Sequence, residues 1–272
     1  DYSFRLLDGI AGVRADELDS DLLCLAVWDG QAGDASGGTA TAVEHWRKSG
    51  RTVEVIDTMR LLRDIAAFDV RTAPDAAASP SVPGPAQTAR FDPHVVGLLF
   101  ADVAGFSRLT DAELPLFVEH ALGVVADEIA RLETPPLLTN TWGDGIYIVF
   151  ASVADAGVFA LRLRDAVRSA DWIAKGFTAP IGIRIGLHAG PAYACQDPVT
   201  GRPSFIGAHV SRAARIEPIT PPGEVYASRA FAALARADGV RDFACTSVGP
   251  MALAKGYGTF PTYVVSARHS RR

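Results

Sequence analysis

Residues 100–108, FADVAGFSR, contain the end of an apolar strand pattern, 94–103, and the start of the turn that follows it. This strand and turn decide the fold predicted for the second part of the chain. Asp102 stands near the end of the strand pattern. The turn after it, with Val103, Ala104, Gly105, Phe106 and Ser107, presents successive backbone N–H groups, which suit phosphate oxygens. A second carboxylate, Asp144, stands between two glycines in WGDGIYIVF (142–150), where another strand begins. If the two strands are neighbours, the carboxylates converge in an arrangement that suits a divalent metal ion.

The composition narrows the class of protein. The 272 residues are 49% hydrophobic and 21% charged, as in a globular protein with a packed core. A net charge of −5 with scattered basic residues argues against a nucleic-acid partner. Cys24, Cys195 and Cys245 are far apart, which favours neither a cysteine zinc site nor a disulfide framework and predicts a reducing, cytoplasmic compartment. No apolar run approaches the roughly 20 residues of a membrane span. The start at Asp1 rather than Met predicts that the chain is a piece of a longer protein.

A segment rich in proline and alanine divides the chain. Its composition buries too little apolar surface to fold, so residues 72–92 are predicted to be a flexible linker between a first part, 1–71, and a second, 93–268. In the first part, LLCLAVWDG (22–30) and RTVEVID (51–57) are predicted strands around a helix that starts near Thr39, a βαβ unit. This unit resembles a fragment of a Rossmann-like sensor domain. Its Gly37–Gly38–Thr39 turn could cradle phosphate, but without a complete phosphate-binding motif the favoured role is the turn alone.

The second part predicts an α+β fold of the ferredoxin-like, palm type, with helices packed on a central, mostly antiparallel sheet. Strand patterns occur at residues 94–103, 145–150, 181–194, 222–228 and 261–265. Helical patterns occur at residues 109–133, 155–172 and 209–219. Thr110 to Glu113 matches a capping box at the start of the first of these helices.

Four motifs of the second part resemble, in their order, the class III nucleotidyl cyclase catalytic domain. They are FADVAGFSRLT (100–110), WGDGIYIVF (142–150), IRIGLHAGPAYA (183–194) and FIGAHVSRAARIEP (205–218). The resemblance covers about residues 93–265. It implies that a nucleoside triphosphate is converted into a 3′,5′-cyclic nucleotide and pyrophosphate with two Mg²⁺ or Mn²⁺ ions. It also implies a homodimer whose two sites are shared across the interface.

The resemblance implies a role for each matched residue. Asp102 and Asp144 would bind the metal ions, with Val103 beside the first. The backbone of residues 103–107 and the side chain of Arg184 would bind the triphosphate. Lys255 in LAKGYG (253–258) matches the family's phosphate-binding lysine near the C-terminus.

Two positions depart from the family's pattern. The helix that carries an asparagine and an arginine in the family has Ser211 and Arg215 here, so a hydroxyl replaces the amide that steadies the sugar. The base-selecting pair is Asn140 and Ser204, where adenylate cyclases have Lys with Asp or Thr and guanylate cyclases have Glu with Cys. Both side chains donate and accept hydrogen bonds, so they enforce no one base edge. ATP is the default expectation, and a pyrimidine nucleotide, as used by similar cyclases of bacterial phage defence, is the alternative.

Two further classes stay open at this point. A diguanylate cyclase or a polymerase palm also places two carboxylates on a related sheet, although the turn at Gly143–Asp144–Gly145 lacks the diguanylate cyclase pattern. The second open class is a catalytically weak protein that senses a nucleotide. Ser211 is compatible with it, because a serine in place of the asparagine could leave a domain that binds a nucleotide without converting it. Formation of a cyclic product with Mg²⁺ or Mn²⁺ separates an enzyme from a sensor.

Overall fold

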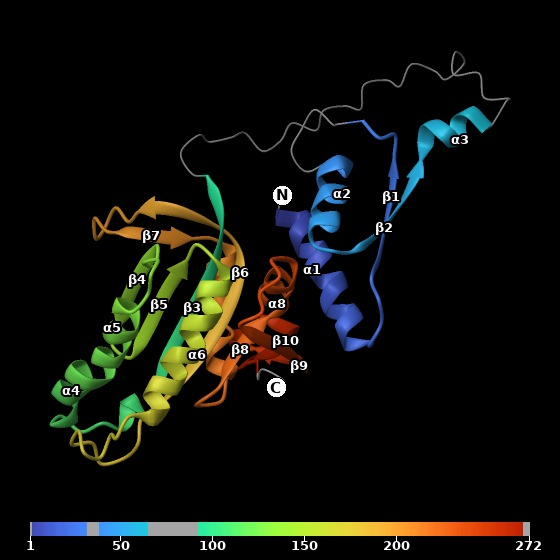
Figure 1. Ribbon diagram of the computed structural model, residues 1–272. Helices are drawn as coiled ribbons and strands as arrows, with labels where there is room; N and C mark the ends of the chain where they lie inside the picture. The colour runs from blue at the N-terminus through green and yellow to red at the C-terminus, as the bar shows by residue number, and fades with distance from the viewer. Residues whose placement is uncertain (1, 32–37, 65–91, 269–272) are drawn as a thin grey trace. The chain divides into compact units, whose positions relative to one another are not determined.

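The computed structural model of the chain describes residues 2–31, 38–64 and 92–268 (Figure 1). Apart from Tyr2 and Ser3, they form two units: residues 14–31 with 38–64, and residues 4–13 with 92–268. Each unit is built around its own sheet. The predicted linker, 72–92, lies outside the described residues except for Asp92, so the domain boundaries stay a prediction.

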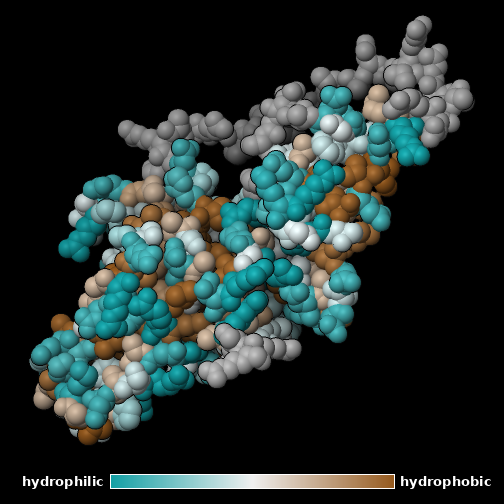
Figure 2. All heavy atoms as spheres, viewed as in Figure 1, coloured by the Kyte–Doolittle hydropathy of each residue, from teal (hydrophilic) through white to brown (hydrophobic). Residues whose placement is uncertain are grey.

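The first unit is a βαβ arrangement, as its sequence predicts. Strands β1 (Leu23–Trp28) and β2 (Thr52–Asp57) pair in parallel, α2 (Thr39–Lys48) stands between them in the chain, and α3 (Thr58–Asp64) follows β2. Cys24 of β1 and Val43 of α2 are buried, because α2 covers one face of the two strands. On the opposite face of β1, Leu23, Leu25 and Val27 are each more than half exposed. Figure 2 shows apolar atoms at the surface in the region where Figure 1 draws this unit.

The second unit is built on an eight-stranded sheet with the order β4-β5-β3-β6-β8-β10-β9, and β7 pairs with β6. Every neighbouring pair is antiparallel except β6 with β8. This confirms the predicted α+β fold with a mostly antiparallel sheet. The strands are β3 (Pro93–Ala104), β4 (Leu138–Trp142), β5 (Gly145–Phe150), β6 (Gly182–Gln196), β7 (Pro203–Ile206), β8 (Val225–Ser228), β9 (Phe243–Leu253) and β10 (Gly258–Ala267).

Helices bury both faces of the central strands. The larger apolar core lies under α5 (Leu122–Ala130), α6 (Val153–Ser169) and α8 (Arg229–Ala237), and a smaller one lies under α7 (Ala208–Ala213). Strand β3 contributes to both, since Leu99 belongs to the larger core and Leu98 to the smaller one. This explains its continuous apolar sequence. Because side chains alternate along a strand, Asp102 lies on the same face as Leu98, the face of α7.

The helical pattern at residues 109–133 is divided in the structure. It forms α4 (Glu113–Leu116), a π-helical turn η3 (Phe117–Ala121) and α5. The Glu113 carboxylate accepts hydrogen bonds from the backbone N–H and hydroxyl groups of Thr110 and Thr178, all at 2.8 Å. These bonds lower the pKa of Glu113 to about 2. The reach of the Glu113 side chain back to the Thr110 N–H confirms this half of the predicted capping box.

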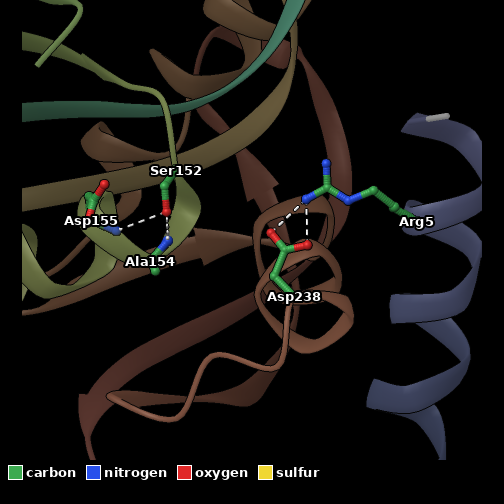
Figure 3. A network of polar contacts seen from close by, with 5 residues as sticks. All are labelled: Arg5, Ser152, Ala154, Asp155 and Asp238. Atoms are coloured by element: carbon green, nitrogen blue, oxygen red, sulfur yellow. Dashed lines mark hydrogen bonds and ion pairs between the residues drawn. The ribbon is translucent and has the colours of Figure 1, made fainter. Parts of the chain in front are cut away.

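Helix α1 (Tyr2–Glu17) was not expected from the sequence. Its residues 4–13 belong to the second unit, where Arg5 pairs with Asp238, just beyond α8, at 2.5 and 2.7 Å (Figure 3). Gly9 lies so close to α8 that a Cβ atom there would meet the carbonyl oxygen of Ala233 at 1.8 Å. Figure 3 also shows the N-cap of α6, where the Ser152 hydroxyl accepts from two backbone N–H groups. No helix within 2–31, 38–64 and 92–268 combines the length and hydropathy needed to cross a membrane.

Candidate active site

The two aspartates singled out by the sequence meet at one end of the sheet. Strands β3 and β5 pair so that Asp102 lies opposite Gly145, and Asp144 occupies the two-residue turn between β4 and β5. The pKa of Asp144 is raised first by burial, and then by a hydrogen bond with the Asp102 carboxyl group and the like charge there. The expected convergence of the carboxylates is therefore present in the structure.

The two positions on either side of Asp144 require glycine for different physical reasons. Gly143 has a φ of 61°, in the left-handed region that glycine tolerates without strain. Gly145 leaves room for the indole of Trp142, because a Cβ atom there would lie 2.5 Å from the indole nitrogen. The Gly-Asp-Gly sequence thus shapes a tight turn that holds Asp144 beside the end of β3.

A cation lies against this pair of carboxylates. Arg184 is directly opposite Asp102 in the β3–β6 register, and its guanidinium group donates to the Asp102 carboxylate. The Arg184 Nε also lies 3.0 Å from Oε1 of Glu217, an ion pair without hydrogen-bond alignment. Arg184 thus bridges Asp102 and Glu217.

Sequence reasoning missed Glu217, which begins the short 3₁₀ turn η4 (Glu217–Ile219). Its side chain is 14% exposed. Burial raises its pKa to about 7, Arg184 opposes this shift, and the charges of Asp102 and Asp144 add to it. A glycine permits the approach, since a Cβ atom at Gly186 would lie 2.5 Å from the Glu217 nitrogen. The sequence did offer one indication of Glu217: it is an acidic residue within the motif at 205–218, which also contains Arg215.

The donor set fits divalent cations that also bind substrate. Asp102, Asp144 and Glu217 outnumber the one guanidinium among them, so added positive charge is favourable when all three are ionised. Over the described parts of the chain, no group of three or more His, Cys, Asp or Glu side chains is placed to hold a metal by itself. Mg²⁺ commonly takes one or two carboxylates and completes its shell with substrate phosphates and water. Val103 could add only its backbone carbonyl, because its hydrocarbon side chain has no atom that binds a metal ion.

The predicted phosphate-binding turn, residues 103–107, begins later than expected, because Val103 and Ala104 still belong to β3 and pair with Ile183 and Gly182 of β6. Gly105 has a φ of 97°, and residues 106–108 form the 3₁₀ turn η2 (Phe106–Arg108). The Arg108 N–H donates to the Gly105 carbonyl at 2.9 Å, which closes the turn. The Phe106 ring packs edge-on against Phe117 at 4.8 Å and anchors it, while Ser107 is exposed. The structure thus places this turn next to Asp102.

The two residues expected to contact the base lie on strands that touch. Asn140 is exposed on β4, opposite Tyr147 of β5. Ser204 is partly exposed on β7, opposite Cys195 of β6. Strands β4 and β7 contact each other without pairing. The arrangement is compatible with one binding surface for a base.

The remaining candidates gather at a second place. Ser211 is exposed on α7, and Arg215 follows that helix by two residues. Lys255 lies in the turn η5 (Ala254–Gly256) with φ 58° and ψ 34°. The Ala254 N–H donates to the Arg215 carbonyl at 3.3 Å, so the two cationic segments adjoin. Across the described residues, neither Arg215 nor Lys255 forms an ion pair with Asp102 or Asp144.

The fold and these motifs place the chain in a family. Residues 89–267 match the adenylate and guanylate cyclase catalytic domain, and the chain belongs to that family. The resemblance seen in the sequence is thereby confirmed. A search of curated proteins gave no match.

Solved cyclase structures share the fold. The adenylyl cyclase CyaB from P. aeruginosa superposes with a TM-score of 0.56 at 18% identity, over 66% of this chain and 97% of that one. The guanylate cyclase domain of RhGC from Catenaria anguillulae, in complex with GTP, superposes with a TM-score of 0.54 at 23% identity, over 65% of this chain and 98% of that one. At these identities the likeness is one of fold.

Proposed function

We propose that the chain is a homodimeric nucleotidyl cyclase, which converts a nucleoside triphosphate into a 3′,5′-cyclic nucleotide and pyrophosphate. The observation that supports this best is the carboxylate pair Asp102 and Asp144 beside Arg184, in a chain of the cyclase family. We also propose a cytoplasmic location, as the widely spaced cysteines indicate.

Asp102 and Asp144 would hold the divalent ions. Two Mg²⁺ or Mn²⁺ ions bound there would activate the ribose 3′-hydroxyl for attack on the α-phosphorus and offset the charge of the triphosphate. Arg184, which pairs with Asp102 in this structure, would then have its planar donors available for phosphate oxygens. Glu217 stays beside Arg184 and limits how far the guanidinium group moves.

The turn after β3 would bind the triphosphate through its backbone. Gly105, with its positive φ, lets the chain turn three residues after Asp102, so the N–H groups at the end of β3 and in the turn would be available to phosphate oxygens. The packing of Phe106 on Phe117 holds the turn in shape before substrate arrives. Such preorganised donors are worth most where charge develops during the reaction.

Arg215 and Lys255 would form the second half of the site. Their segments are joined by a backbone hydrogen bond, and neither residue pairs with the carboxylates of its own chain within the described ranges. A two-fold dimer would bring this half of one protomer to the carboxylates of its partner, giving two equal sites. Arg215 would stabilise the transferring phosphoryl group and Lys255 the leaving pyrophosphate. Loss of either is expected to reduce turnover by about 10²–10³-fold.

Asn140 and Ser204 leave the base open. An amide and a hydroxyl each donate and accept, so neither rejects one base edge by charge. ATP is proposed as the default substrate, with a pyrimidine nucleotide as the alternative. Ser211 is proposed to reach the ribose directly or through a water molecule. A slow or purely nucleotide-sensing protein is the competing outcome.

One experiment tests the reaction and names the base. The chain is incubated separately with ATP, GTP, CTP and UTP plus Mn²⁺, and the products are identified by chromatography and mass. Asp102→Asn should abolish product while it keeps the shape of the side chain. Asp127→Asn, on an exposed position of α5, is the matched control and should remain active. Nucleotide binding without any cyclic product from the unmodified chain would overturn the proposal in favour of a sensor.

A further inference from the structure

A cavity separate from the carboxylate pair lies within the second unit. Its volume is about 200 Å³. It is bounded by α1, by α7 and the segment after it, by the start of α8, and by residues of β6, β8, β9 and β10. For scale, an engineered apolar cavity of about 150 Å³ binds benzene. Its apolar walls are Leu6, Ile10, Ile216, Leu253 and Phe260.

Helix α1 forms one side of this cavity and is fixed by several contacts. The Arg5–Asp238 pair holds the helix near its start (Figure 3), and Gly9 sits directly against the backbone of Ala233. The Tyr2 ring meets the His209 ring edge-on at 5.8 Å. The wall supplied by Leu6 and Ile10 is therefore a packed part of the unit.

The cavity contains a cation without an anionic partner. Arg212 of α7 places its guanidinium carbon 4.9 Å from the centre of the Phe260 ring and 5.9 Å from that of Tyr257. Among the described residues no ion pair includes Arg212, and no carboxylate lines the cavity. Arg229 lies at the same wall and is exposed. An anion entering here would meet positive charge and no acidic competitor.

A buried histidine, His188, forms part of the polar wall of the cavity. His188 is fully buried, with its ring nitrogens 2.6 Å from the Ser228 hydroxyl and 2.8 Å from Nδ1 of His209. Burial lowers the pKa of His188 well below its usual range, helped by the charges of His209 and Arg212, and the pKa of His209 is lowered by burial and by Arg212. The positive charge is thus concentrated on the arginines.

We propose that this cavity binds a small organic monoanion, of the size and chemistry of an aromatic carboxylate, with its carboxylate on Arg212 and its ring between α1 and Phe260. A guanidinium group matches a carboxylate through paired N–H donors. The apolar walls accommodate the ring. This ligand is distinct in place and chemistry from a nucleoside triphosphate.

Ligand binding in the cavity would change the position of α7. Arg212 is adjacent in sequence to Ser211 and three residues before Arg215, and Ile216 belongs both to the cavity wall and to the approach to Glu217. A ligand that draws Arg212 away from Phe260 would therefore shift the segment that bears the candidate catalytic groups. This regulatory consequence rests on the proposed function, whereas binding itself does not.

Calorimetric titration of the full chain with benzoate tests the site without any enzyme assay. Benzyl alcohol is the neutral ligand of matched size and should bind at least about 10-fold more weakly, since a charge-assisted contact is worth about 10- to 100-fold. Arg212→Gln should weaken benzoate binding by a similar factor, and Arg212→Lys should retain part of it. Arg241→Gln, on an exposed residue, is the matched control and should bind as the parent does.

A second variant removes the space instead of the charge. Ile10→Phe fills the cavity from α1 and should block benzoate, with circular dichroism confirming that the variant is folded. The proposal is overturned if benzoate fails to bind the unmodified chain, if benzyl alcohol binds equally well, or if Arg212→Gln leaves benzoate affinity unchanged. Benzoate binding in a chain that makes no cyclic nucleotide would refute the proposed function and leave this site standing.

Discussion

Replacing Gly186 with alanine tests whether the close contact between β6 and η4 holds the candidate site together. A Cβ atom at this position would lie 2.5 Å from the Glu217 nitrogen, 2.9 Å from its Cα and 3.1 Å from the carbonyl carbon of Ile216. Ordinary contacts of this kind are about 3.5–4.0 Å. The η4 backbone must therefore move by about 1 Å. Because the contacted atoms belong to the main chain, no rotamer change relieves the clash.

The expected magnitude follows from two opposing effects. Overpacking costs about 1–3 kcal/mol, whereas alanine in a strand recovers about 0.5–1 kcal/mol of the conformational entropy that glycine loses. The net loss in unfolding free energy should lie near the middle of the resulting range of about 0–2.5 kcal/mol, at about 1 kcal/mol. Urea unfolding followed by circular dichroism would show it as a lower midpoint with an unchanged slope. Nucleotide binding should weaken as well, because Glu217 would move away from Arg184.

Gly182→Ala on the same strand is the matched control. Its Cβ atom would meet nothing closer than the Pro222 Cβ at 3.5 Å, an ordinary contact. This variant should keep its stability or gain up to about 1 kcal/mol. Equal stability of the two variants would refute the claim that η4 is clamped against Gly186.

Three further predictions concern other parts of the chain. Ser211→Asn restores the family's amide, so turnover should rise by about 10-fold or more; an unchanged turnover would show that the serine already suffices. The raised pKa of Glu217, about 7 against 4.5 in the unfolded chain, means that the folded state holds a proton longer. The contribution of Glu217 to the unfolding free energy should therefore fall as pH rises from about 4.5 to 7, by at most about 1.4 kcal/mol per pH unit, and Glu217→Gln should make the slope in pH-dependent unfolding experiments shallower by that contribution. Gly9→Ala should release α1 and raise hydrogen exchange in α8, whereas Gly123→Ala, open to solvent in α5, should stabilise its helix by about 1 kcal/mol; similar exchange in both would contradict the tight contact at Gly9.

The strands around the carboxylates were predictable because their patterns are local. The run from His94 to Val103 is apolar over strand length, and an apolar run of strand length also follows the Gly-Asp-Gly turn. Strand β4, which precedes that turn, was not predicted. The convergence of Asp102 with Asp144 depended on the strands being neighbours, and the observed register supplies that condition.

Other features depend on contacts between distant segments, so local patterns did not reveal them. Helix α1 contains two glycines and few cues of its own, and it is held by Ala233 and Asp238. In the sequence alone, Glu217 resembles an ordinary surface acid. Its position against β6 depends on Gly186, which lacks the Cβ atom that would clash with the Glu217 backbone. Strand β9 passes through Gly249 and Pro250, which on their own indicate a turn. In each case tertiary packing decides against the local preference.

The ion pair between Arg5 and Asp238 joins residues 233 positions apart, and this separation sets an order for assembly on the ribosome. At about 5–20 residues per second, roughly 10–50 s pass between synthesis of the two partners. For most of that time α8 has not been synthesised, so the apolar residues Leu6 and Ile10 cannot pack near it. A nascent chain halted just before Asp238 would already contain every proposed catalytic and metal-binding residue except Lys255, yet its first helix would still lack its ion-pair partner.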